Sequence, residues 1–162
     1  MKAIILKESE NTEKTALYRV FKEAKPYFNK IEGRDPLKPL IPINDLIPDI
    51  PAENCYCFSI YYGETIIGYL WVFNDSPSSY YILHFYISKK FRNLGLGKLA
   101  IKELENRYNP AQLKKAELVV SANNYLGLRF WNSVGFNKMI NVYKEDDIGA
   151  TSVELELQKI YR

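Results

Sequence analysis

The chain of 162 residues is poor in the residues that build metal clusters and disulfide scaffolds: it has one histidine, His84, and two cysteines, Cys55 and Cys57. One histidine and two cysteines cannot supply the four ligands of a zinc cluster, and two cysteines cannot make a multi-disulfide framework. Since Cys55 and Cys57 stand two apart on an expected strand, they share one face, which disfavours a bond between them. We therefore expect reduced core cysteines and no metal.

The sequence also lacks a long apolar run and a strong excess of one charge. No stretch approaches the roughly 20 apolar residues that span a bilayer, and the first ten residues are charged too early for a signal peptide. The formal net charge of +3 is too small to suggest the basic stripe of a nucleic-acid-binding protein. With 47% apolar and 25% charged residues, we expect a cytoplasmic protein with one domain over residues 1–162. A monomer and a homodimer both stay open.

Hydrophobic periodicity and the positions of Pro and Gly predict the order of the elements. Residues 1–7 form an expected strand, and a helical pattern follows. Residues 31–54 hold five of the eight prolines, so we expect a packed excursion with a short helix at 43–47. Further strands are expected in the hairpin 55–73 and over 80–88, 116–122, 137–144 and 152–158, with helices over 96–108 and 124–134 and a polar turn at 145–150. This order predicts an α+β fold with a mixed, mostly antiparallel seven-stranded sheet and helices on both faces.

The most informative segment is a glycine loop at residues 87–98, between an expected strand and an expected helix. Gly95 and Gly97 let the backbone approach a ligand, and the helix that follows offers unpaired N–H groups. Together with Arg92 and Lys98 at the rim, these groups favour an anion, most naturally a phosphate.

Two other interpretations of this loop must be weighed. It is, first, compatible with a plain strand-to-helix connection whose basic residues face water. It also fits the dinucleotide pattern G-x-G-x-x-G/A through Gly95, Gly97 and Ala100. Against that pattern, the loop follows three antiparallel strands, and Glu117 opens the next strand, where a dinucleotide fold has its acidic residue at the strand's end.

A third interpretation rests on two blocks that resemble the GCN5-related N-acetyltransferase (GNAT) superfamily. Arg92-Asn-Leu-Gly-Leu-Gly97 is R-x-x-G-x-G, and residues 124–136 match N-x-x-A-x-x-F-Y-x-x-x-G-F, with Gly127 at the alanine and Trp131 at the tyrosine. The resemblance is sharpest over residues 80–136, and the order of the other elements also agrees. It implies that strands 80–88 and 116–122 run parallel and splay apart around acetyl-CoA.

In that family the loop holds the diphosphate of acetyl-CoA, and the backbone of the preceding strand binds the pantetheine arm. The resemblance therefore implies a set of residues that contact the donor: Phe85, Tyr86, Ile87, Arg92, Asn93, Leu94, Gly95, Leu96, Gly97, Lys98, Asn124 and Trp131. Asn124 has an alternative role as a helix cap, which Asn123 could equally fill.

The proton acceptor for the attacking amine departs from the family pattern. Members often have a carboxylate on the strand before the loop, whereas residues 80–88 contain no Asp or Glu. His84 is the only side chain with an intrinsic pKa near neutrality, and by alternation it shares a face with Ile82 and Tyr86. We therefore hypothesise that His84 is the general base, directly or through a water; the alternative is a structural, hydrogen-bonded histidine.

The proton donor to the leaving thiolate also differs from the family pattern. The family's usual tyrosine is replaced by Trp131, whose indole N–H cannot act as an acid. Tyr86 is our candidate replacement, and Tyr125 and Tyr143 stay open. The thiolate can also leave with electrostatic help alone.

Charge suggests the acceptor. Residues 31–54 carry five acids and two bases, and Glu145-Asp146-Asp147 lies in a loop that the resemblance places at the acceptor cleft. An acidic rim attracts a cation. We therefore expect an acetyl-CoA-dependent N-acetyltransferase that acetylates a primary amine (a small amine, a polyamine or a peptide amine) by direct attack. The alternatives are a non-catalytic acyl-CoA-binding or regulatory module and a nucleotide-dependent oxidoreductase.

Overall fold

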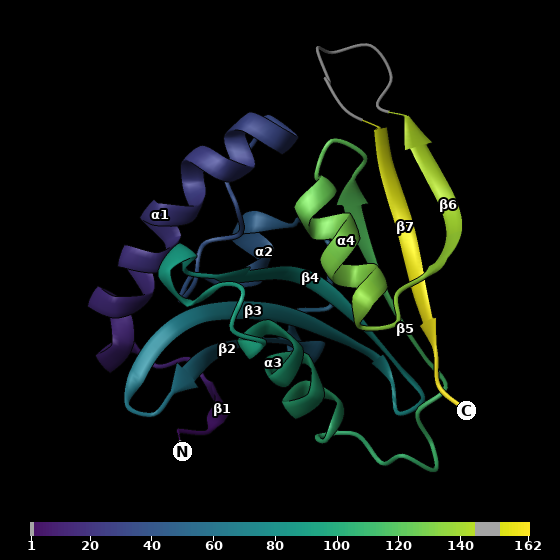
Figure 1. Ribbon diagram of the computed structural model, residues 1–162, viewed down its shortest axis with the longest axis horizontal. Coiled ribbons are helices and arrows are strands. Elements are labelled where there is room, and N and C mark those ends of the chain that lie inside the picture. Colours follow the sequence, from purple (N-terminus) through teal and green to yellow (C-terminus); the bar gives the residue numbers. More distant parts are fainter. Residues whose placement is uncertain (1, 145–152) are drawn as a thin grey trace.

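The computed structural model describes residues 2–144 and 153–162 (Figure 1). Within them, seven strands form one sheet in the order β1-β2-β3-β4-β5-β7-β6. The strands are β1 (Ile4–Glu8), β2 (Cys55–Tyr62), β3 (Thr65–Ser76), β4 (Ser79–Ile87), β5 (Lys115–Ser121), β6 (Lys138–Lys144) and β7 (Val153–Ile160). The helices are α1 (Lys14–Glu32), α2 (Ile43–Leu46), α3 (Leu96–Glu105) and α4 (Tyr125–Ser133). The predicted element order and the mixed α+β architecture are confirmed.

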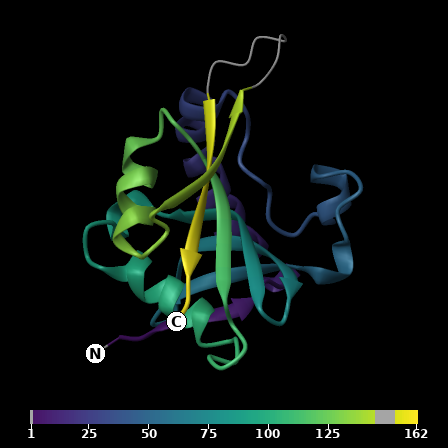
Figure 2. The same ribbon diagram turned by 90° about the vertical axis from the view of Figure 1, so that its right-hand side faces the viewer.

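The sheet is covered on both faces, as the alternation of β3 shows. Leu70 and Val72 belong to the core beneath α3 and α4, whereas Tyr69 and Trp71 belong to the core beneath α1 and α2. Successive side chains of a strand point to opposite faces, so one strand serves both cores. Figures 1 and 2 show the helices on the two sides of the sheet.

Helix α1 forms one wall of the candidate site described below. Its buried positions, among them Leu17 and Phe21, recur at helical spacing and pack on the sheet. The helix continues past Pro26 to Glu32 and ends there because Gly33 takes the left-handed conformation, with φ 70°. Glu32 therefore lies at the point where the chain leaves the helix and turns into the Pro-rich segment.

The Pro-rich segment is packed, as expected. Its main chain accepts hydrogen bonds from two side chains of β3: Tyr69 Oη donates to Leu37 O at 2.6 Å and Trp71 Nε1 donates to Lys38 O at 3.2 Å. Ile43, at the start of the predicted short helix, is buried. Figure 2 shows the segment, in blue, beside the strands. These contacts fix it over the sheet at β3.

Strands β4 and β5 form the parallel pair, and they splay apart. Their pairing runs from Ser79 opposite Lys115 to Ile82 opposite Leu118, although β4 continues to Ile87 and β5 to Ser121. Beyond Ile82, one edge of β4 therefore lacks its strand partner. The splayed parallel strands implied by the resemblance are present.

A β-bulge at the start of this splay corrects one expectation. Ile82 pairs with Val72 and His84 with Trp71, so Leu83 is the extra residue on β4. The extra residue shifts the alternation by one: Ile82 lies in the core beneath α3 and α4, while Leu83 packs on the other core and His84 stacks on Tyr69 there. The prediction that Ile82, His84 and Tyr86 share one face was wrong for Ile82.

None of the helices in residues 2–144 and 153–162 is long and apolar enough to cross a membrane. The predicted turn at 145–150, with its three acidic residues, lies outside the described residues.

Candidate active site

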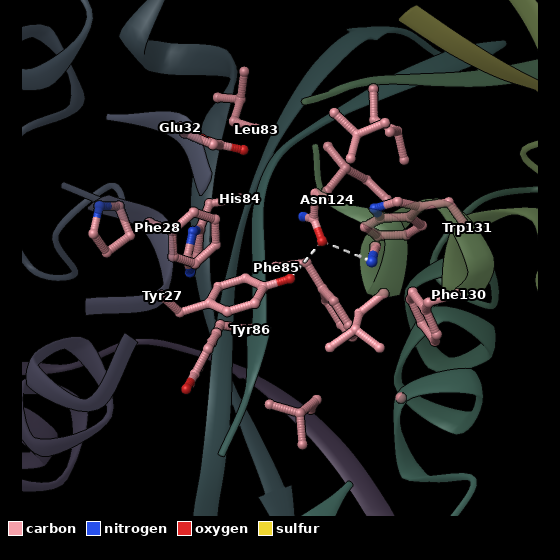
Figure 3. A pocket seen from close by; sticks show the side chains of 18 of the residues that line it. Tyr27, Phe28, Glu32, Leu83, His84, Phe85, Tyr86, Asn124, Phe130 and Trp131 are labelled. Atoms are coloured by element: carbon pink, nitrogen blue, oxygen red, sulfur yellow. Dashed lines mark hydrogen bonds between the residues drawn. The ribbon is translucent and has the colours of Figure 1, made fainter. Parts of the chain in front are cut away.

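The diverging ends of β4 and β5 open into a cavity of about 1330 Å³. Its walls come from α1 and the segment after it, from the two strands, from the glycine loop and from α4. In Figure 3, Tyr27, Phe28 and Glu32 of α1 lie on one side of the cavity and Asn124, Phe130 and Trp131 on the other. The wedge between the strands is thus lined by side chains that are far apart in the sequence.

The glycine loop forms one end of this cavity. Asn93 and Gly95 both take positive φ, 60° and 76°, and α3 begins directly after Gly95. A Cβ on Gly95 would have no atom within 4 Å, so the backbone here is open toward the cavity. A left-handed glycine followed by a helix N-terminus is an arrangement that binds phosphate groups.

Gly97 has a different physical role. A Cβ at Gly97 would lie 3.0 Å from Phe130 Cε2, so its absence allows α3 to pack against α4. Leu96 is buried in the core and Leu94 is exposed. These two residues can therefore contact a ligand through their main-chain groups. The second glycine of the pattern is therefore explained by packing.

Arg92 is fixed beneath the loop. Its Nε donates a hydrogen bond to Ile87 O at 2.9 Å, and its guanidinium carbon lies 4.8 Å from the centre of the Tyr86 ring and 5.6 Å from that of Tyr27. These contacts hold a positive charge at the junction of β4, α1 and the loop.

Phe85, Phe130 and Trp131 form an aromatic cluster in the lining of the cavity. Phe85 stacks on Phe130 with ring centres 5.4 Å apart, and Trp131 lies 5.4 Å from Phe85 and 4.9 Å from Phe130. Trp131 is also part of the core, with 8% of its surface exposed. These rings form an apolar wall along the wedge.

Asn124 joins the two sides of the cavity. It caps α4 by accepting a hydrogen bond from Gly127 N at 2.8 Å, and it accepts a second one from the hydroxyl of Tyr27 (Figure 3). A Cβ at Gly127 would lie within 2.6–2.9 Å of the Asn124 side chain, which explains the glycine at this position. The cap role is present for Asn124, and Tyr27 is a site residue that the sequence did not reveal.

His84 is enclosed on the α1 side. It is 6% exposed, and its ring centre lies 4.4 Å from that of Tyr69 and 5.4 Å from that of Phe28. Burial lowers the pKa of the imidazole to about 3, and Nε2 has no hydrogen-bond partner in the part of the chain that the structure describes. An imidazole with so low a pKa binds a proton weakly, so this environment disfavours the general-base role, which stays a prediction.

The candidate tyrosine hydroxyls are mostly engaged elsewhere. Tyr86 donates to Glu23 Oε1 at 3.2 Å, and burial raises its pKa to about 12. Tyr143 lines the cavity but donates to Glu156 Oε2 at 2.7 Å, and Tyr125 is 78% exposed outside the lining. The hydroxyl that points across the cavity belongs instead to Tyr27 (Figure 3).

Glu23, in turn, fixes α1 to the end of β4. Its carboxylate accepts hydrogen bonds from Lys89 N at 2.8 Å, from Ser88 Oγ at 3.0 Å and from the hydroxyl of Tyr86. Partial burial works to raise the pKa of Glu23, but these bonds outweigh it and the pKa is lowered. The wall formed by α1 is thereby tied to the residues that lead into the glycine loop.

The charged residues of the lining are segregated. The lining residues in the segment of the glycine loop are all basic, Lys89, Arg92 and Lys98, and a fourth base, Arg129, lies on α4, whose Phe130 packs against Gly97. The other charged lining residues gather around Glu32, which Figure 3 shows toward the same end as Leu83: Arg34 pairs with both Glu32 and Glu154, and Asp35 follows Arg34 in the chain. The cavity therefore has a cationic end and a mainly anionic end.

Sequence comparison agrees with the chemistry of this cavity. The family model described as the acetyltransferase (GNAT) family matches residues 15–136, which is most of the chain. The chain therefore belongs to the GNAT acetyltransferase family. It is an N-acetyltransferase that acts on amino groups, with acetyl-CoA as the acetyl donor. A search of curated protein sequences finds no significant match.

Solved structures share the fold at low sequence identity. An acetyltransferase from Salmonella typhimurium that modifies the N-terminal serine of ribosomal protein L7/L12 is 12% identical, with a TM-score of 0.78 over 99% of this chain and 96% of that one. The microcin C7 self-immunity acetyltransferase MccE, in complex with acetyl-CoA and AMP, is 18% identical, with a TM-score of 0.72 over 98% and 92%. The PaiA N-acetyltransferase of Thermoplasma acidophilum, in complex with coenzyme A, is 16% identical, with a TM-score of 0.65 over 98% and 99%. At these identities the likeness establishes the fold.

Proposed function

We propose that residues 1–162 act as one N-acetyltransferase domain that transfers the acetyl group of acetyl-CoA directly to a cationic primary amine. The amine belongs to a small molecule, a polyamine or a peptide. Because both cysteines are unpaired, we also propose a reducing, cytoplasmic location.

The observation that carries this proposal is the segregation of charge along one cavity. The donor is polyanionic at its diphosphate and neutral at its thioester, so it fits with the diphosphate at the basic end. A primary amine is cationic at neutral pH, since its intrinsic pKa is roughly 10.4, and it fits the acidic end. The two substrates then meet in the middle.

The donor is held, in this proposal, mainly by main-chain groups. Asn93, Gly95 and the first turn of α3 bind the diphosphate, with Lys98 at the rim. From Phe85 to Ile87, β4 lacks its partner on one edge, so its peptide groups are available to the amides of the pantetheine arm. Asn124 and Trp131 form the opposite wall.

A direct attack fits better than an acyl-enzyme. A covalent route needs a reactive thiolate in the cavity. Both cysteines lie outside the cavity lining, and burial raises the pKa of Cys57 to about 12. We therefore propose that the amine itself attacks the thioester.

The test is the release of free thiol from acetyl-CoA with a panel of acceptors. The panel contains a polyamine, a peptide with a free N-terminus, a simple alkylamine, and neutral and anionic compounds. We expect release that depends on a cationic primary amine, together with a mass increase of one acetyl group on that amine.

Two controls accompany this experiment. Thermal stabilisation by acetyl-CoA, and none by NAD(H), checks the donor before the chemistry. Turnover restricted to neutral or anionic acceptors would contradict the proposed acceptor. Binding of acetyl-CoA without turnover of any amine would favour the acyl-CoA-binding module.

A further inference from the structure

One carboxylate at the acidic end has a distinctive position. Glu32 is the last residue of α1, its side chain is 15% exposed, and it lines the cavity; Figure 3 shows it toward the same end of the cavity as Leu83. Leu83 is the bulge residue at which β4 begins to diverge from β5. Glu32 therefore lines the end of the cavity at which β4 and β5 begin to diverge, the apex of the wedge.

The apex is where the acetyl group is expected, given the proposed function on which this inference rests. The arm of the donor starts at the glycine loop and runs along the unpaired edge of β4 from Ile87 toward Leu83. At Ile82 the two strands are paired again and close the wedge. The thioester is consequently held near Leu83, close to Glu32.

The other two acids at this end are engaged differently. Asp35 accepts a hydrogen bond from Asn29 at 2.7 Å and pairs with Lys25 at 3.4 Å, and these contacts lower its pKa. Glu154 Oε1 lies 2.6 Å from Arg34 Nη2, whereas Glu32 Oε2 lies 3.6 Å from Arg34 Nε. Arg34 is thus paired with both of these partly buried acids.

Burial raises the pKa of Glu32; Arg34 offsets part of this rise, and Glu154 adds to it. A carboxylate with a raised pKa is a better proton acceptor than an ordinary one, because base strength grows as the pKa approaches the working pH. The environment of Glu32 therefore suits proton transfer.

We propose that Glu32 is the proton acceptor for the attacking amine. A primary ammonium loses one proton to expose its lone pair, the nitrogen bonds to the acetyl carbon, and a second proton leaves as the amide forms. Glu32 takes these protons in turn and releases them to water. The C–S bond breaks with its electron pair on sulfur, which takes one proton, so each turnover releases one proton to solution.

The variant that tests this role is Glu32→Gln, which keeps the shape and removes the basicity. We expect kcat to fall by about 10²-fold or more at neutral pH, with the KM for acetyl-CoA unchanged. The loss should shrink at high pH, and also with an acceptor amine of low pKa, because such an amine is already neutral. Unchanged acetyl-CoA binding shows that the variant is folded.

The pH profile separates proton transfer from simple attraction of a cation. Wild type should show an acidic limb in kcat/KM that Glu32→Gln lacks. Glu154→Gln should keep the limb but move it to lower pH, since the charge that raises the Glu32 pKa is gone. Glu64→Gln, an equal change of charge in the β2–β3 turn, is the control that should behave as wild type.

Other titratable groups face this end of the cavity. Their pKa values are shifted to positions where they would not produce the acidic limb of the kcat/KM profile. His84 is held at about 3, and burial raises the pKa values of Tyr27 and Tyr81 above their ordinary range. The pKa of Tyr143 is also raised, through its hydrogen bond to Glu156. The remaining charged groups there are Arg34, Asp35 and Glu154.

The outcomes are distinguishable from those of the proposed function. If wild type releases thiol with a primary amine and Glu32→Gln keeps both kcat and the acidic limb, the role of Glu32 is overturned and the function stands. If wild type turns over no primary amine, the proposed function fails and this inference with it.

Discussion

At the scale of the residue, the buried imidazole of His84 costs the protein stability in acid. The side chain packs between the rings of Tyr69 and Phe28, and no described residue accepts or donates a hydrogen bond at its Nε2. A buried group of this kind stays neutral, because its charged form would lose hydration without gaining a partner. The unfolded chain, by contrast, is free to protonate it.

The pH dependence of stability follows directly. The pKa of His84 is about 3 in the folded protein and roughly 6.5 in the unfolded chain. Between these values only the unfolded chain binds the proton. The free energy of unfolding therefore falls as the pH drops below 6.5, by up to about 1.4 kcal/mol per pH unit.

His84→Phe should remove this part of the acid sensitivity, because a phenyl ring fills the site without a titratable group. Urea unfolding at pH 7.5, 6.0 and 5.0 measures the effect, and we expect a flatter pH dependence for the variant. Equal slopes in the two proteins would show that His84 is not the group responsible. If the acidic limb of kcat/KM disappears in the same variant, His84 is the base after all.

At the scale of the element, the glycine loop combines two different requirements. Gly95 is needed for its backbone conformation and the open space beside it, and Gly97 for the contact of α3 with Phe130. The sequence pattern predicted the loop and its place between β4 and α3. It could not separate the two glycines, because the neighbour of Gly97 lies on another helix.

A pair of matched substitutions tests the role of Gly95. Gly95 and Gly63 both have positive φ, 76° and 63°, but Gly63 lies in the β2–β3 turn next to the side chain of Lys2. Gly95→Ala and Gly63→Ala should each cost about 1 kcal/mol of stability, since alanine is strained in this conformation. We expect only Gly95→Ala to weaken acetyl-CoA binding, by about tenfold or more, measured by isothermal titration. If both variants bound acetyl-CoA equally well, the proposal that this loop binds the diphosphate would be contradicted.

At the scale of the whole molecule, the site joins parts of the chain that local patterns do not connect. The order of strands and helices follows from periodicity and from Pro and Gly, and those signals are local. Tyr27 meets Asn124 across 97 residues, and Arg34 meets Glu154 across 120. The bulge at Leu83 depends on the register of two strands. Such tertiary contacts leave no mark on a hydrophobic pattern, so Tyr27 and Glu32 could not be assigned to the site from sequence.

The same assembly produces the charge separation of the cavity, which makes binding dependent on salt. Raising the salt from about 0.1 M to about 1 M shortens the Debye length from about 10 Å to about 3 Å. The affinity for acetyl-CoA should fall, while that for S-acetylpantetheine, which lacks phosphates, should change little. Equal salt dependence of the two donors would contradict a basic end that binds the diphosphate.

Charge-reversal variants test which basic residues are responsible for the electrostatic part of acetyl-CoA binding. Arg129 lies on α4 in the cavity lining, whereas Lys102 lies on the exposed side of α3 outside it. Arg129→Glu and Lys102→Glu change the net charge equally. At low salt, Arg129→Glu should weaken acetyl-CoA binding by about tenfold, which corresponds to about 1.4 kcal/mol, and Lys102→Glu should weaken it far less. An equal loss in both variants would mean that the donor responds to the overall charge of the protein, because a local diphosphate site requires the lining residue to dominate.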